Sequence, residues 1–163
     1  MDLQLRGKTA FVSGSTQGIG YAVASALAAE GVRVIVNGRG EDSVAAAVAE
    51  LRSVHPGAEH SGLAADFGDT AQVDALLERL GAVDILVNNV GVFGLAPFAD
   101  IADDEWARYL EVNLMSGVRL SRHLLPGMLE RGSGRIVFVG SESGVNVPAD
   151  MVHYGVTKAA MLA

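Results

Sequence analysis

Short apolar runs alternate along the chain with longer segments whose apolar residues recur every three or four positions. The short runs predict β-strands at residues 8–12, 32–37, 58–65, 83–87 and 135–139. The longer segments predict α-helices at residues 17–30, 42–54, 69–80 and 103–130, with a further helix from residue 151. Residues 141–150 are expected to form a loop.

Residues that commonly start or stop helices support these boundaries. Gly31 ends the first helical segment, Pro56 and Gly57 end the second, and Asp69 is expected to cap the third. Pro126 predicts a kink or break near the end of the long fourth helix.

Strands that alternate with helices predict right-handed crossovers and a parallel sheet. The strands are continuously apolar, which indicates that helices cover both faces of the sheet. The sequence therefore predicts an α/β fold, with a doubly wound parallel sheet of five strands inside three α/β/α layers. No repeat or linker interrupts the pattern, so one domain over residues 1–163 is expected.

Composition narrows the possible partners. The net charge is −7 and no basic cluster occurs, which argues against nucleic acid or an anionic membrane as the main partner. The chain has no cysteine, and its four histidines show no metal-ligand spacing, so no metal site is expected. Residues 1–8 are polar, and no apolar run approaches membrane-spanning length, so a cytoplasmic location is expected.

Residues 13–20 read Ser-Gly-Ser-Thr-Gln-Gly-Ile-Gly and connect the first strand to the first helix. A helix N-terminus offers unpaired N–H groups and partial positive charge, which together stabilise a pyrophosphate. Gly14 permits a tight turn, Gly18 lets the backbone approach phosphate, and Gly20 permits close helix packing. The spacing differs from Gly-x-Gly-x-x-Gly, and a glycine-rich turn without a ligand is the alternative interpretation.

Tyr154 and Lys158 lie four residues apart, so they share a face of the last helix. A tyrosine phenol has a pKa of about 10, and a nearby cation favours its ionised form. This pairing is typical of acid–base chemistry, although two unrelated residues on an amphipathic helix would give the same spacing.

Five motifs occur in one order: the glycine turn, Asn88-Asn89-Val90-Gly91, Asn113, Ser141 and Tyr154-x-x-x-Lys158. In this order and spacing the chain resembles the classical short-chain dehydrogenases/reductases over nearly its whole length. The resemblance implies an NAD(P)-binding Rossmann-like domain that transfers a hydride between NADP(H) and a small carbonyl or alcohol substrate. Ser13 and Val90 stand where the family usually has threonine and alanine.

The resemblance also implies catalytic roles. Tyr154 exchanges a proton with the substrate oxygen, and Lys158 favours the phenolate and holds the nicotinamide ribose. Ser141 orients the substrate, with Ser143 as a rival that fits the spacing less well. Asn113 holds a water in the proton relay, and a buried polar residue satisfied by backbone is its alternative interpretation. Residues that are expected to line the substrate site are Phe93, Val145, Asn146 and Val147.

The residues expected to bind the cofactor come from most of these motifs. They are Gly14, Ser15, Gly18, Ile19, Gly20, Arg39, Asp66, Asn88, Gly91, Tyr154 and Lys158. Asp66 would face the adenine, or else cap a loop. NAD-preferring members carry an acidic residue where this chain has Gly38, and Arg39 follows. An arginine binds a 2′-phosphate, so NADP(H) is favoured over NAD(H), although Gln17 replaces a basic residue common in NADP-preferring members.

The chain ends five residues after Lys158, whereas family members continue through about two more strands and a substrate loop. A C-terminally incomplete domain is therefore expected. The alternative function is a truncated, non-catalytic remnant that at most binds the dinucleotide. At full length, a homodimer or homotetramer is expected through the helices at residues 103–130 and from residue 151.

Overall fold

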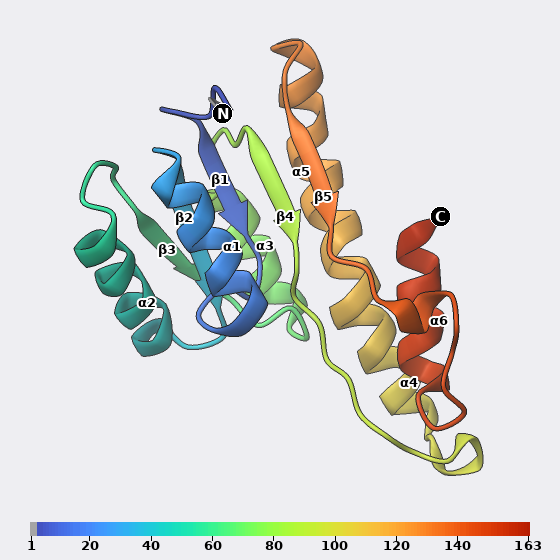
Figure 1. Cartoon of the computed structure of the whole chain (residues 1–163). Coiled ribbons are helices and arrows are strands. Elements are labelled where there is room, and N and C mark those ends of the chain that lie inside the picture. The colour runs from blue at the N-terminus through green and yellow to red at the C-terminus, as the bar shows by residue number, and fades with distance from the viewer. Residues whose placement is uncertain (1–2) are drawn as a thin grey trace.

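Five parallel strands and the helices between them form the body of the molecule (Figure 1). The computed structural model describes residues 3–163, and residues 1–2 of the polar N-terminal segment lie outside them. The strands are β1 (Thr9–Val12), β2 (Arg33–Gly38), β3 (Ser61–Ala64), β4 (Ile85–Asn88) and β5 (Arg135–Phe138). The longer helices are α1 (Gly18–Ala29), α2 (Glu41–Val54), α3 (Thr70–Arg79), α4 (Asp103–Tyr109), α5 (Ser116–Glu130) and α6 (Val152–Leu162).

The strand order in the sheet is β3-β2-β1-β4-β5, and every neighbouring pair is parallel. Ala10 on the central strand pairs with Val34 of β2 and with Ile85 of β4. The order of strands along the chain reverses between β1 and β4. In sheets of this type, such a reversal opens a crevice at the carboxyl ends of the strands, where ligands bind.

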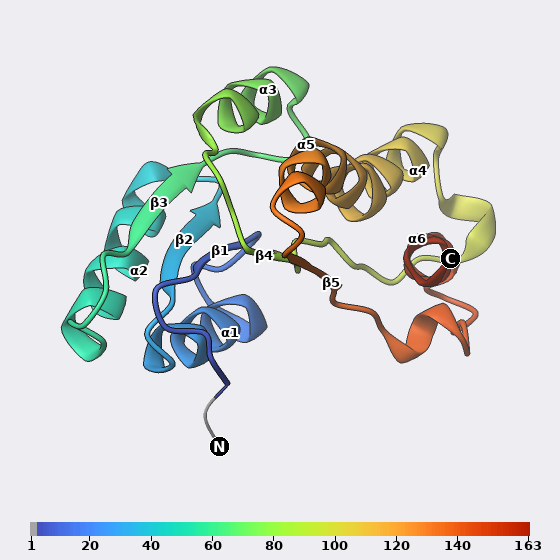
Figure 2. The same cartoon turned by 90° about the horizontal axis from the view of Figure 1, so that it is seen from above.

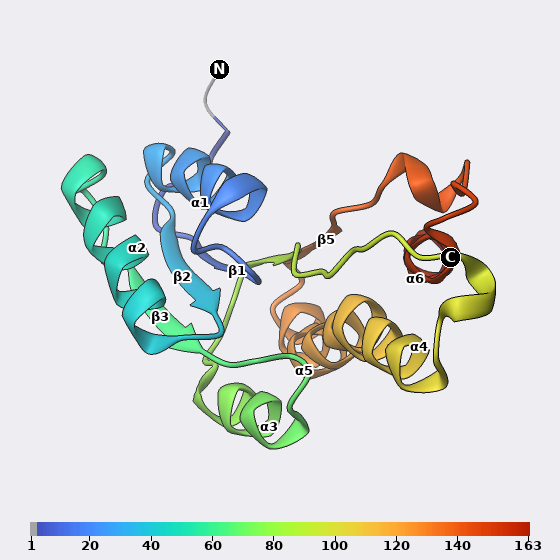
Figure 3. The ribbon, with the colours of Figure 1, turned by 90° about the horizontal axis from the view of Figure 1, so that it is seen from below.

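Side chains of the central strand alternate between two apolar layers, as the pleat of a strand requires. Ala10 and Val12 pack against α1 and α2, whereas Phe11 packs with residues of α3 and α5 on the opposite face. The views along the sheet show these helices on its two sides, with α6 beyond β5 (Figures 2 and 3). The predicted three-layer α/β/α architecture is confirmed.

Residues 103–130, expected as one helix, form three segments. A π-helical stretch, η2 (Leu110–Met115), separates α4 from α5. The prediction that Pro126 kinks or breaks the helix near its end is wrong in its stronger form, because α5 continues through Pro126 to Glu130. Proline removes one backbone hydrogen bond, and here Arg122, whose carbonyl would have accepted it, is an exposed residue.

The third strand is shorter than expected, because pairing with β2 begins at Ser61. Just before it, the His60 ring accepts a hydrogen bond from the backbone N–H of Val34. A side chain therefore satisfies this donor. Two short 3₁₀ turns, η1 (Phe98–Asp100) and η3 (Glu142–Gly144), occur outside the predicted helices. Within residues 3–163 no helix is both long and apolar enough to cross a membrane.

Candidate active site

The glycine turn between β1 and α1 has the backbone that only glycine adopts easily. Gly14 and Gly18 have φ angles of 61° and 59°. A Cβ atom on Gly20 would lie 2.3 Å from the carbonyl oxygen of Gly14, so the first turn of α1 packs directly on the loop. Gln17 occupies the N-cap position, and among the described residues its side chain makes no capping hydrogen bond. The start of α1 is therefore left open to an anion.

Buried polar side chains hold this turn in place. Ser15 donates its hydroxyl to the carbonyl of Val12 and accepts from the backbone N–H of Asn37. Asn37 in turn accepts from the N–H of Gly14. The structure therefore places Ser15 beneath the turn, where it supports the backbone. Asn37 was missed from the sequence, and its signal is a polar residue near the end of an apolar strand.

Asn89 supports the same turn from β4. Its side-chain amide donates to the carbonyls of Ser13 and Gly14 at 3.0 and 2.9 Å. The Ser13 hydroxyl accepts from the backbone N–H groups of Asn89 and Val90, so the hydroxyl that replaces the family's threonine is in use. Asn88 points elsewhere, because its amide donates to the Ser121 hydroxyl on α5. Asn89 therefore contacts the turn directly, and Asn88 does not.

A cleft of about 830 Å³ opens at the carboxyl ends of β1, β2 and β4. Four of the predicted cofactor residues line it, namely Gly14, Arg39, Asp66 and Gly91. Ile19 is 68% exposed. The other predicted cofactor residues outside the lining are Ser15, Gly18, Gly20, Asn88, Tyr154 and Lys158. Further lining residues that the sequence did not single out include Thr16, Phe67, Arg108 and Val112.

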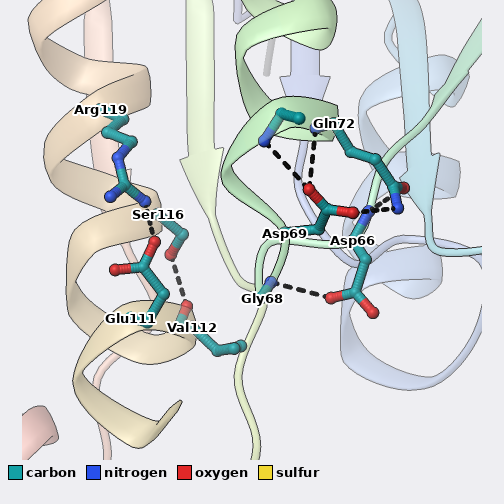
Figure 4. A network of polar contacts seen from close by, with 9 residues as sticks. Asp66, Gly68, Asp69, Gln72, Glu111, Val112, Ser116 and Arg119 are labelled. Atoms are coloured by element: carbon teal, nitrogen blue, oxygen red, sulfur yellow. Dashed lines mark hydrogen bonds and ion pairs between the residues drawn. The ribbon is translucent and has the colours of Figure 1, made fainter. Parts of the chain in front are cut away.

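Figure 4 shows the two walls of this cleft beyond the glycine turn. On one wall, Asp66 accepts a hydrogen bond from the N–H of Gly68, which is the loop-capping contact considered from the sequence. Asp69 caps α3 by accepting from the N–H groups of Ala71 and Gln72, as predicted. A hydrogen bond from the Gln72 side chain, assisted by these backbone donors, lowers the pKa of Asp69 below its ordinary value.

The opposite wall of the cleft comes from the end of α4 and from η2. Glu111 forms an ion pair with Arg119 (Figure 4). The Ser116 hydroxyl donates to the carbonyl of Val112, four residues earlier. The arginines that line the cleft are Arg39 and Arg108, and neither of them belongs to this ion pair.

Lys158 lies deep in the molecule beside Tyr154. The lysine is 4% exposed, and its Nζ donates to the carbonyl of Val139 at 2.8 Å. Nζ also lies 5.7 Å from the centroid of the Tyr154 ring. Burial lowers the pKa of Lys158 below its ordinary value, because desolvation disfavours the charged ammonium. The structure thus brings the two residues of the Tyr-x-x-x-Lys motif together.

Asn113 connects this pair to the rest of the site. Its Oδ1 accepts from the N–H of Val92 at 2.7 Å, and its Nδ2 donates to the carbonyl of Val92 and to the Thr157 hydroxyl. Thr157 then donates to the carbonyl of Tyr154 at 2.7 Å. The side chain of Asn113 is therefore satisfied by protein groups, and its role in a water relay stays a prediction. Thr157, which was not predicted from the sequence, links Asn113 to the backbone of Tyr154 through these hydrogen bonds.

Gly91 lies close to the same group. A Cβ at this position would be 3.4 Å from Asn113 Oδ1 and 3.9 Å from Lys158 Nζ. Gly91 also lines the cleft described above. The cleft and the Tyr154–Lys158 pair therefore meet at Gly91.

Ser141 is the N-cap of the 3₁₀ turn η3, which packs against α6. Its hydroxyl oxygen accepts from the N–H of Ser143 at 3.2 Å, so its own hydrogen is free to donate to a substrate. A Cβ on Gly144 would lie 2.9 Å from the backbone carbon of Lys158. This close packing holds the Ser141 turn along the helix that carries Tyr154 and Lys158.

Apolar side chains lie near the Tyr154 ring. The Phe93 ring meets it edge-on, with the centroids 6.3 Å apart, although Phe93 is 76% exposed. Val145 and Val147 are also exposed, whereas Asn146 donates to the carboxylate of Glu142. Phe93 is thus in contact with the candidate catalytic group, and the substrate contacts of all four residues stay predictions.

The doubly wound sheet and the glycine-turn cleft define a Rossmann-like α/β protein. The model of the family described as short chain dehydrogenase matches residues 8–163. The chain belongs to this family.

Similar proteins carry oxidoreductase names. The chain is 48% identical over 162 residues to "Uncharacterized oxidoreductase YvaG" of Bacillus subtilis, covering 99% of this chain and 61% of that protein. It superposes with a TM-score of 0.94, at 36% identity, on L-sorbose reductase from Gluconobacter frateurii complexed with NADPH and L-sorbose, covering 99% and 63% of the two chains. A 3-oxoacyl (acyl-carrier-protein) reductase from Agrobacterium tumefaciens with NADP bound gives 0.88 at 36% identity, covering 96% and 61%. The chain spans about three fifths of the length of these relatives.

Proposed function

We propose that this chain forms the NADP(H)-binding and proton-transferring part of a short-chain dehydrogenase/reductase that interconverts a carbonyl and an alcohol. One observation carries the proposal: the buried Lys158 ammonium lies over the Tyr154 ring and next to Gly91, which lines the cleft. Membership of the short-chain dehydrogenase family supports the proposal.

The described residues fit a dinucleotide. The uncapped N-terminus of α1 suits a pyrophosphate, and a Cβ on Gly18 would meet nothing within 4 Å, so backbone near this residue is open to an approaching phosphate. Gly14, Arg39, Asp66 and Gly91 would hold the cofactor along the cleft, with Lys158 near its far end. When bound, NADPH supplies the hydride for carbonyl reduction.

NADP(H) is the preferred cofactor in this proposal. Gly38 ends β2 and Arg39 follows it, both lining the cleft, and neither carries a negative charge that would repel a 2′-phosphate. The guanidinium of Arg39 can donate charge-assisted hydrogen bonds to that phosphate. The NADPH and NADP in the two similar structures are consistent with this preference.

The chain's own groups can complete the chemistry. The Tyr154 hydroxyl donates its proton to the carbonyl oxygen of the substrate, and the Ser141 hydroxyl donates a hydrogen bond to the same oxygen. The Lys158 ammonium, 5.7 Å from the ring, stabilises the negative charge that develops on Tyr154 as the proton leaves. Thr157 and Asn113 hold the backbone of Tyr154 in position.

Cofactor preference is tested by replacing Arg39. We expect Arg39→Ala to weaken NADPH binding roughly 10–100-fold, the equivalent of one or two lost charge-assisted hydrogen bonds, and to leave NADH binding unchanged. Arg33→Ala, at the start of β2 and outside the lining of this cleft, is the matched control. Dissociation constants measured by calorimetry decide the matter, and equal affinity of the wild type for NADH and NADPH contradicts the assignment.

The proton donor is tested by Tyr154→Phe. We expect the substitution to lower NADPH-dependent ketone or aldehyde reduction by at least about 100-fold, because the ring stays and only the transferable proton is removed. Tyr21→Phe, on α1, removes a hydroxyl outside the site and serves as the control. Substantial turnover by Tyr154→Phe would rule out the mechanism. NADPH binding without turnover by the wild-type chain would favour the alternative, a protein that only binds the dinucleotide.

A further inference from the structure

His153 precedes Tyr154 in the first turn of α6 and is completely buried. Within the described part of the chain, neither of its ring nitrogens has a hydrogen-bond partner. Two aromatic residues of α4 enclose the ring: Tyr109, with centroids 4.1 Å apart, and Trp106, at 6.2 Å. A neutral imidazole always carries one N–H, and buried N–H groups are nearly always paired in proteins, so this arrangement needs a physical reason.

The nearest candidate partner is Glu105, also on α4. Its Oε1 lies 3.8 Å from Nε2 of His153, within ion-pair range but beyond a hydrogen bond. The Glu105 side chain is 39% exposed, so it can rotate toward the ring. Glu105 lies in the first turn of α4, where the helix dipole stabilises a carboxylate.

The other titratable groups around α6 have other partners or lie in solvent. Lys158 donates to the carbonyl of Val139, and Asp150, just before α6, is exposed, as are Asp103 and Asp104 on α4. Tyr109 is kept neutral by a pKa raised through burial and the nearby Glu105. On η2, Glu111 is paired with Arg119, and on η3, Glu142 accepts from Asn146. Residues 92–97, which pass the same helix, contain no titratable side chain. Glu105 is therefore the carboxylate positioned to form an ion pair with a positively charged His153.

We propose that His153, when protonated, forms a buried ion pair with Glu105 that fixes the first turn of α6 against α4 and thereby positions Tyr154. The start of α6 needs such a contact, because Met151 at its N-cap makes no side-chain capping bond among the described residues. Thr157 and Asn113 anchor the helix one turn later. The part of the proposal that concerns Tyr154 rests on the function proposed above.

The direction of the pH dependence follows from the charges. A protonated ring carries a positive charge that the Glu105 carboxylate attracts, so the pair holds the turn when the ring is protonated. As the pH rises through the titration, the ring becomes neutral and the attraction to Glu105 is lost. Positioning of Tyr154 is therefore strongest on the acid side and weakens toward alkaline pH.

The chain's single tryptophan, Trp106, reports directly on His153, because an imidazolium quenches the emission of a neighbouring indole. We titrate its fluorescence between about pH 5 and 8 in the wild type, E105Q and H153Q. D104N, which removes a charge from the same helical turn, is the matched control. We expect a transition with weaker emission at acid pH, lost in H153Q, unchanged in D104N, and moved to lower pH in E105Q because the facing carboxylate is removed.

Absence of a transition in the wild type, or an E105Q midpoint equal to that of the wild type, overturns the ion pair. These readings need no turnover, so they stand even if the proposed function fails. Should H153Q not fold, E105Q decides alone, because Glu105 is partly exposed.

The positioning role has its own test in steady-state kinetics with NADPH. We expect E105Q to lower kcat several-fold on the acid side with KM for NADPH unchanged, and E105D to recover part of the loss. A shifted fluorescence midpoint together with an unchanged kcat profile overturns the positioning role. If the wild type neither binds NADPH nor shows turnover while Trp106 titrates as expected, it is the proposed function that fails.

Discussion

At the scale of single residues, the glycine turn depends on the absence of a Cβ atom at Gly20. Gly20 faces the carbonyl of Gly14 and the amide of Asn89, and a Cβ there would lie 2.3 and 2.5 Å from them. Both neighbours are part of the hydrogen-bonded support of the turn, so neither can move without loss elsewhere. Gly20 therefore allows the first turn of α1 to pack closely against the glycine turn itself.

This requirement makes Gly20→Ala a sharp test. We expect the added methyl group to cost about 1–3 kcal/mol of unfolding free energy, because it forces the turn away from α1, and to weaken NADPH binding. Gly81→Ala is the control, since a Cβ there would meet nothing within 4 Å. Denaturant unfolding of both variants measures the difference, and equal stability of the two would contradict the packing argument.

At the scale of elements, helix ends and helix irregularities shape the site. Asp69 caps α3 at one wall of the cleft, and the π-helical η2 forms the other. Asn113 belongs to η2 and uses its whole amide to join the segment after β4 to α6. Polar contacts therefore help to hold both walls of the cleft.

The cap on α3 predicts a pH-dependent contribution to stability. Hydrogen bonding lowers the pKa of Asp69 in the folded state, so its contribution is present above the ordinary pKa of about 3.9 and is lost as the pH falls through the folded value. We expect Asp69→Ala to lower Tm at neutral pH, with the difference from wild type narrowing below about pH 4. Asp74→Ala, on the same helix, is the control, and a constant difference at all pH values would exclude the charged cap.

At the scale of the whole molecule, the sheet is buried unevenly. Three of the four residues of β1 are fully buried between β2 and β4, whereas β5 lies at the edge with Val137 and Phe138 46% and 40% exposed. Edge strands present unpaired backbone groups and open first. The site spans this gradient, because the glycine turn follows β1 and Ser141 follows β5.

Hydrogen exchange followed by mass spectrometry should show this gradient. We expect amides of β1 and β4 to exchange slowest, and those of β5 and α6 to exchange much faster. NADPH should increase protection at residues 13–20 more than in β5. Protection of β5 equal to that of β1 would contradict the expectation and would mean that another strand covers this edge in solution.

The sequence by itself determined the order of the elements, the three layers and the motif residues, because burial on both faces of a parallel sheet demands continuous apolar strands and periodic helices. It also predicted the Asp69 cap, whose partners are two and three residues away. What only the tertiary structure decided are contacts between distant segments. The support of the turn by Asn37 and Asn89, the diversion of Asn88 to Ser121, and the Thr157 link to Asn113 all join residues more than 20 positions apart. Local sequence patterns do not predict such pairs, because the packing of distant segments determines which polar groups come within hydrogen-bond distance.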